Sequence, residues 1–89
     1  MNRIKISKPT KAELDKLGID KWSKWECEPG TFDWTYEDKE TAYVFEGKVK
    51  VKSGNEEVEI NGGDLVTFPK GMKCTWTIIN KIRKVYKFG

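Results

Sequence analysis

The sequence of 89 residues contains no histidine and only two cysteines. Without an imidazole, the chain cannot form a Ser-His-Asp triad, use a histidine as general base or bind a metal through histidine. The cysteines, Cys27 and Cys74, are too few for a disulfide framework, and their spacing matches no paired-thiolate metal motif. We therefore expect two reduced, buried thiols, and histidine chemistry is excluded before any motif is considered.

Long apolar runs are also missing from the chain. No segment approaches the roughly 18 consecutive apolar residues of a membrane-spanning helix. The first five residues lack the apolar run of a secretory signal. We therefore expect no membrane partner and a cytoplasmic location.

Neither sign of charge dominates, since 17 Lys and Arg residues stand against 14 Asp and Glu residues and leave a formal net charge of +3. Nucleic-acid-binding domains usually carry a denser basic face, so we expect no nucleic-acid partner. The most basic stretch, residues 81–87, alternates like a strand, and we expect an edge strand whose Lys and Arg side chains face water. The predominance of Lys over Arg is typical of heat-adapted proteins.

The N-terminal part of the chain predicts a short strand followed by one helix. An alternating apolar pattern at residues 4–7 indicates the strand. Thr10 and Glu13 have the spacing of a capping box, and Gly18 stands where a C-terminal cap would end a helix of about two turns. We assign the strand and the helix to residues 1–20.

The remaining chain, from about residue 21 to residue 88, predicts strands only. Short segments rich in Val, Ile, Thr and aromatic residues alternate with turn residues. The turn sequences are Pro29-Gly30, Gly47, Ser53-Gly54-Asn55, Asn61-Gly62-Gly63-Asp64 and Pro69-Lys70-Gly71. Six to eight strands at this spacing favour an antiparallel sandwich or barrel. The length allows one domain, which we place at residues 1–89.

Two segments carry residues at a characteristic spacing. The first consists of Trp34-Thr35-Tyr36, three residues, Glu40, six residues and Gly47. The second consists of Gly63, five residues, Pro69-Lys70-Gly71, two residues, Cys74, three residues and Ile78. Both are similar to the two motifs of the cupin superfamily, small β-barrels of the RmlC-like jelly-roll group. In that family, histidines stand at the positions of Trp34, Tyr36 and Cys74.

Residues 32–47 and 63–71 resemble more specifically the ureidoglycine aminohydrolase-like cupins, many of which are small stand-alone proteins. The resemblance covers about residues 20–88. It implies an all-β cupin or jelly-roll barrel with a short N-terminal helix. It also implies a metal-dependent reaction on a small ureido compound, although the metal-ligand positions differ here.

If the family's ligand positions face the barrel interior, strand alternation places several of these side chains in one cavity. The expected ligand-binding residues are Trp34, Tyr36, Glu40, Cys74 and Trp76. Of these, only Glu40 and Cys74 could ligate a metal, whereas first-row metal sites need three or four protein ligands. We therefore predict a site without metal or cofactor, and a small-molecule ligand.

Three of these residues are also candidates for catalysis. An aromatic surrounding would disfavour the charged carboxylate and make Glu40 a candidate acid or base. Tyr36 could donate a hydrogen bond, and Cys74 could act as nucleophile if a neighbour stabilised its thiolate. The alternatives are structural, with a hydrogen-bonded Glu40, an apolar buried Cys74 and aromatic side chains that fill the barrel.

Three functions follow from this pattern, and the sequence leaves them open. The first is metal-independent binding of a small molecule, the second is an enzyme acting on a small ureido or amide compound, and the third is a structural or interaction module. Thr41, Tyr43 and Phe45 would lie on the face opposite Glu40, where the helix or a second chain could cover them. A homodimer is therefore a further hypothesis.

Overall fold

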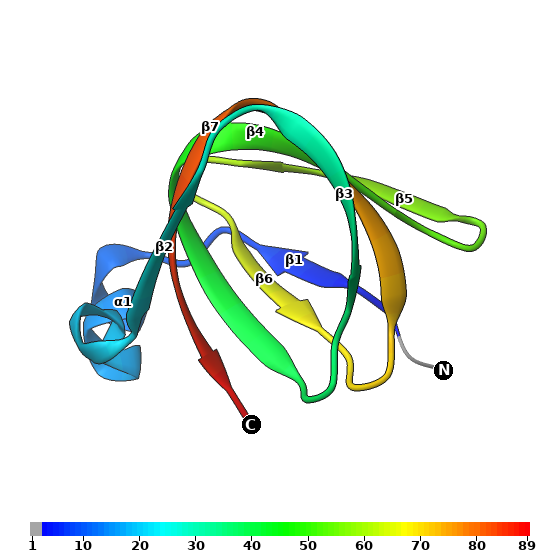
Figure 1. Cartoon of the computed structure of the whole chain (residues 1–89). Helices are drawn as coiled ribbons and strands as arrows, with labels where there is room; N and C mark the ends of the chain where they lie inside the picture. Colours follow the sequence, from blue (N-terminus) through cyan, green and yellow to red (C-terminus); the bar gives the residue numbers. More distant parts are fainter. Residues whose placement is uncertain (1–2) are drawn as a thin grey trace.

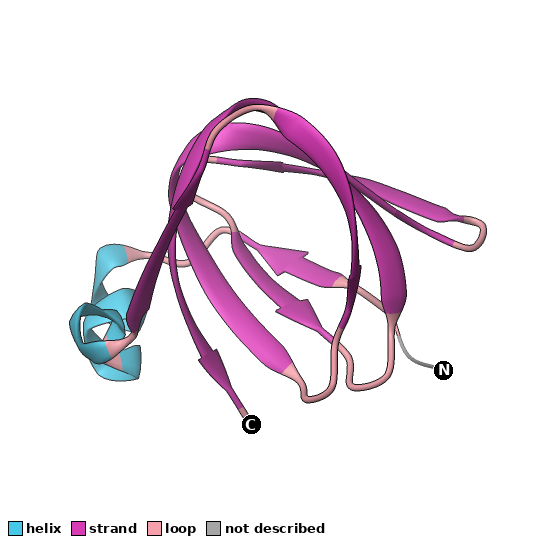
Figure 2. Cartoon of the chain, in the orientation of Figure 1, coloured by secondary structure: helices cyan, strands magenta, loops and turns pink. Residues whose placement is uncertain are grey.

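The computed structural model describes residues 3–89, and its seven strands form one antiparallel sheet that curls into an open barrel (Figure 1). The strands are β1 (Lys5–Ser7), β2 (Ser23–Cys27), β3 (Gly30–Thr35), β4 (Glu40–Ser53), β5 (Glu56–Asn61), β6 (Leu65–Phe68) and β7 (Lys73–Phe88). The helix α1 (Lys11–Leu17) and the 3-10 turn η1 (Ile19–Lys21) lie at one side of the barrel (Figure 2). The predicted all-β fold with a short N-terminal helix is confirmed.

The two long strands, β4 and β7, pair with each other and form the centre of the sheet. Along its other edge, β7 pairs first with β3 through residues 73–78 and then with β2 through residues 82–86. Near its start β4 pairs with β6, and near its end with β5. Strand β1 pairs with β6, so the N-terminal segment belongs to the same sheet.

The predicted edge strand at residues 81–87 is wrong. This segment is the second half of β7 and has β4 on one side and β2 on the other. Gly47 also lies inside β4, where the register with β7 shifts, instead of separating two strands. Its φ of +122° suits glycine, and a Cβ there would lie 2.7 Å from the Cα of Ile82.

The helix forms as its local sequence predicts. The backbone amide of Glu13 donates to the Thr10 hydroxyl at 3.2 Å, and the amide of Thr10 donates to the Glu13 carboxylate at 3.0 Å. Gly18 ends the helix in the left-handed conformation, with φ +68°. Within residues 3–89, no helix combines the length and the apolar character needed to cross a membrane.

Alternation along β4 separates the core from the outer face of the barrel. Glu40, Ala42 and Val44 are buried, whereas Tyr43 is half-buried and Phe45 is 46% exposed. The side chain of Arg83 lies over the Phe45 ring, with its guanidinium carbon 5.9 Å from the ring centroid. The outer side of β4 therefore carries two aromatic rings, those of Tyr43 and Phe45, beside the charged Arg83. The homodimer stays a prediction, which light scattering of the purified protein at micromolar concentration can test.

Candidate functional site

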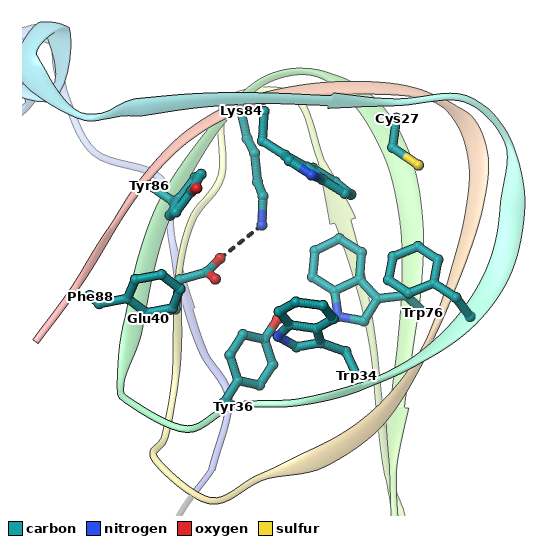
Figure 3. Close-up of a pocket in the computed structure, with 10 residues that line it drawn as sticks. Cys27, Trp34, Tyr36, Glu40, Trp76, Lys84, Tyr86 and Phe88 are labelled. Atoms are coloured by element: carbon teal, nitrogen blue, oxygen red, sulfur yellow. Dashed lines mark hydrogen bonds and ion pairs between the residues drawn. The ribbon is translucent and has the colours of Figure 1, made fainter.

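The barrel contains a pocket of about 470 Å³ between β2, β3, β7 and the start of β4. It is lined by Trp25, Cys27, Phe32, Trp34, Tyr36, Glu40, Trp76, Lys84, Tyr86 and Phe88 (Figure 3). Seven of these ten residues are aromatic, and only Glu40 and Lys84 are charged. Its size and apolar walls are those of a typical small-molecule site.

Strand alternation brings these side chains together. From β7, the even-numbered residues Trp76, Lys84, Tyr86 and Phe88 line the pocket, and β2 and β3 contribute the opposite wall. Tyr36 follows β3 directly, and its backbone is held by the neighbouring turn. Its amide donates to the carbonyl of Met72 at 2.9 Å, and its carbonyl accepts from the amide of Gly71 at 2.6 Å.

A buried ion pair joins the two charged residues of the pocket. The Nζ atom of Lys84 lies 2.8 Å from Oε2 of Glu40, as the dashed line in Figure 3 marks. The side chains are only 7% and 5% exposed. Burial lowers the pKa of the Lys84 ammonium, and the adjacent Glu40 carboxylate opposes this shift. Each charge therefore depends on the other, because an unpaired charge at this depth is costly.

Aromatic rings enclose the ammonium group of Lys84. Its Nζ lies 4.7 Å from the ring centroid of Trp76, 4.9 Å from that of Trp25 and 5.6 Å from that of Tyr86. These distances are within the range of cation–π attraction. The amine is thus held at a defined place in the pocket wall by three rings and one carboxylate.

Two further polar groups belong to the same wall. Burial raises the pKa of the Tyr36 hydroxyl far above its ordinary value, and the negative charge of Glu40 adds to this rise. The hydroxyl therefore stays protonated at neutral pH. The indole N–H of Trp76 is buried and has no hydrogen-bond partner among residues 3–89. Such a donor could bind an acceptor atom of a ligand.

The expected site residues separate into two groups. Trp34, Tyr36, Glu40 and Trp76 line the pocket together, whereas Cys74 is not among the lining residues, and ligand binding by these residues stays a prediction. Cys74 is buried, and its thiol lies 3.6 Å from the carbonyl oxygen of Trp34. Burial raises the pKa of this thiol, which does not favour a nucleophilic thiolate. The other cysteine, Cys27, is half-buried and lines the pocket, so the expectation of two buried thiols holds only for Cys74.

Lys84 does not face water as expected but is buried in the pocket wall. The pattern contains the information, because Lys84 stands two residues after Ile82 and two residues before Tyr86. Period-two alternation therefore places all three on one face, and Ile82 is fully buried. The other basic residues of this segment, Lys81, Arg83 and Lys87, are exposed as expected. Trp25, which pairs across the sheet with Lys84, was missed with it.

The residues at the motif positions do not fit a metal ion. Two of these positions carry aromatic rings, Trp34 and Tyr36, and the carboxylate of Glu40 is bound by the Lys84 ammonium. A cation beside Glu40 would be repelled by this ammonium. Within the described residues, no group of three or more His, Cys, Asp or Glu side chains could hold a metal ion.

The fold, the motif spacing and the interior site define a cupin. Residues 14–86 match the EutQ-like cupin domain family, and the chain belongs to this family. The predicted resemblance to the cupin superfamily is therefore confirmed.

Several known proteins are similar to the chain. A solved structure from Thermotoga maritima, of the DUF861 family, is 44% identical with a TM-score of 0.96 and matches 98% of this chain and 100% of that one. The solved EutQ protein of Clostridium difficile is 30% identical with a TM-score of 0.65, over 71% of this chain and 50% of that one. The curated acetate kinase EutQ of Clostridioides difficile (strain 630) is 31% identical over 77 residues. The chain spans about half the length of this relative, since the match covers 86% of the chain but 47% of EutQ.

Proposed function

We propose that this cupin binds a small, planar, uncharged molecule in the aromatic pocket without using a metal. The observation that supports this most is the composition of the pocket, in which seven aromatic side chains surround one buried Lys84–Glu40 pair. A volume of about 470 Å³ leaves room for a ligand with a single ring or a short chain.

The polar groups favour an amide or ureido compound. Lys84 and Glu40 together carry no net charge, so a neutral ligand avoids burying an unpaired charge. Lys84 offers further N–H donors, and Oε1 of Glu40 accepts no hydrogen bond from the described residues. A donor and an acceptor side by side complement the C=O and N–H of one amide, while the rings stack on its plane.

Catalysis on the same class of compound is a second candidate. The observation that favours it is the 2.8 Å hydrogen bond between the buried side chains of Glu40 and Lys84, which can act as an acid and base pair. The resemblance of residues 32–47 and 63–71 to the ureidoglycine aminohydrolase-like cupins, which stays a prediction, would imply this class of substrate. The acetate kinase activity that the name of the curated relative gives belongs to a longer protein, of which this chain covers only 47%.

Tryptophan fluorescence tests the proposal, because Trp25, Trp34 and Trp76 all line the pocket. Benzamide and hydantoin serve as probes, since each offers an adjacent C=O and N–H on a planar frame. We expect a saturable change in emission that Lys84→Met abolishes. The matched control Lys50→Met alters an exposed lysine of β4 and should bind like the wild type.

The proposal fails if neither probe changes the emission of the folded wild-type protein. It also fails if Lys84→Met, with an unchanged circular dichroism spectrum, binds both probes as well as the wild type does. Hydrolysis of either probe by the wild type and not by Glu40→Gln would favour the enzyme. A stable complex with another protein and no binding of either probe would favour an interaction module.

A further inference from the structure

We propose that Lys84 is a carbonyl-reactive lysine that condenses with a small aldehyde or ketone in the pocket to form a Schiff base. The inference rests on the pocket being open to small molecules, as the proposed function requires, and adds a covalent step at the same site. Such a step needs a reactive amine, a group that carries protons and space for the carbonyl compound.

The amine is the Nζ of Lys84, which lines the pocket. The side chain is 7% exposed, and burial lowers the pKa of its ammonium, which increases the fraction of nucleophilic amine at neutral pH. Lys81 of the same strand is the opposite case. It is 51% exposed, and hydrogen bonding and charge from Glu26 and Glu28 raise the pKa of its ammonium. The two lysines thus provide an internal comparison.

The proton carrier is Glu40, whose Oε2 accepts a hydrogen bond from Nζ at 2.8 Å. Its other oxygen, Oε1, accepts no hydrogen bond from residues 3–89 and is free to face a bound molecule. A carboxylate at this distance can take the proton from the ammonium and return it later to a reacting oxygen. Glu40 therefore has the position that both proton transfers require.

The space for the carbonyl compound is the aromatic pocket. The rings of Trp76 and Trp25 lie 4.7 and 4.9 Å from Nζ and restrict where the amine can point. A planar aldehyde such as benzaldehyde can stack on such walls with its carbonyl carbon toward Nζ.

The step balances without a further reactant. The ammonium first gives a proton to Glu40, and the free electron pair of Nζ then forms a bond to the carbonyl carbon. The carbonyl oxygen gains a proton that leaves the nitrogen, so that a neutral carbinolamine forms. Glu40 returns its proton to the hydroxyl, the C–O bond breaks and water leaves. The product is a protonated imine beside the Glu40 carboxylate, so one ammonium and one carbonyl compound give one iminium and one water.

Reductive trapping tests this inference. The wild-type protein is treated with limiting benzaldehyde and sodium cyanoborohydride at neutral pH, and peptide mass spectrometry locates the benzylated lysines. We expect Lys84 to be labelled at least about tenfold faster than Lys81, because its lowered pKa favours the free amine and the Trp25 and Trp76 rings can hold the aldehyde beside Nζ. Glu40→Gln should slow the labelling of Lys84, while Lys81→Arg should leave it unchanged. The comparison within the wild-type protein stands even if a site variant does not fold.

Labelling of exposed lysines with Lys84 unmodified would overturn the inference. Benzamide separates this failure from failure of the proposed function, because it resembles benzaldehyde but does not form an imine. If benzamide changes the tryptophan emission and Lys84 stays unlabelled, only the Schiff-base inference is wrong. If benzamide does not bind and Lys84 stays unlabelled, both proposals are wrong. Labelling of Lys84 that benzamide inhibits by competition supports both.

Discussion

The Nζ atom of Lys84 donates a hydrogen bond of 2.8 Å to Oε2 of Glu40, and the two side chains are 7% and 5% exposed. Glu40 opens β4, and Lys84 lies on the neighbouring strand β7, opposite Val44. The pair thus spans the two central strands at the pocket. A barrel interior normally excludes such charges, so the pair is the feature that separates this site from a purely apolar core.

The first prediction concerns the stability of this pair. Lys84→Met leaves the Glu40 carboxylate buried without its partner and should cost about 3–5 kcal/mol of unfolding free energy, measured by urea denaturation. The double variant Glu40→Leu/Lys84→Met removes both charges and should recover much of this loss. Lys50→Met, on the exposed side of β4, should barely move the midpoint. The single variant Glu40→Leu completes the comparison. If the double variant loses as much unfolding free energy as Glu40→Leu and Lys84→Met lose together, the two residues are not coupled.

The second prediction is a pH dependence caused by Lys84. Its pKa is lowered on folding, so between the folded value and the ordinary value of 10.5 the unfolded chain binds more protons. The stability that this residue contributes therefore rises as the pH rises through this window. From pH 7 to pH 9.5, we expect the unfolding free energy of the wild type to rise relative to that of Lys84→Met, as measured by urea denaturation at each pH. A difference that stays constant, or moves the other way, would contradict the lowered pKa.

The third prediction has the opposite sign and concerns Tyr36. Because burial raises the pKa of its hydroxyl above the ordinary value of 10.0, the unfolded chain loses this proton first. Stability is therefore fully present below pH 10 and decreases as the pH rises beyond it. Above pH 10, the melting temperature of Tyr36→Phe should therefore fall less steeply than that of the wild type. Tyr43→Phe, which alters a half-buried tyrosine of the outer face, is the control and should follow the wild type.

Local and long-range features of this chain differ in how far the sequence predicts them. The capping box at Thr10 and the cap at Gly18 depend on hydrogen bonds between residues a few positions apart, and the helix was predicted with its ends. On one side, β7 pairs with β2 and β3, which lie far earlier in the chain, so the local pattern of β7 does not reveal these partners and predicts an edge strand instead. Strand pairing depends on the whole sheet and is not contained in a local pattern.

The candidate site shows the same division. Trp34, Tyr36 and Glu40, which the motif spacing groups together, line one pocket, because glycine and proline turns keep these positions in register. Cys74 follows the same spacing, yet its thiol lies against the backbone of Trp34 and not in the pocket lining. The direction of one side chain at the end of a strand depends on packing with its neighbours. Lys84 shows that a charged residue in an alternating strand follows the alternation when a buried partner compensates its charge.

The last prediction uses the two cysteines as reporters of the pocket. Cys27 is half-buried and lines the pocket, whereas Cys74 is buried and burial raises the pKa of its thiol. Since alkylation needs an accessible thiolate, iodoacetamide should modify Cys27 at least about tenfold faster than Cys74 in the folded protein. Benzamide bound in the pocket should slow the modification of Cys27 and leave Cys74 unaffected, as followed by peptide mass spectrometry. Urea-unfolded protein is the control, because both thiols should then react at similar rates. Equal rates in the folded protein, or faster modification of Cys74, would contradict an accessible Cys27 in the pocket and a buried Cys74 outside it.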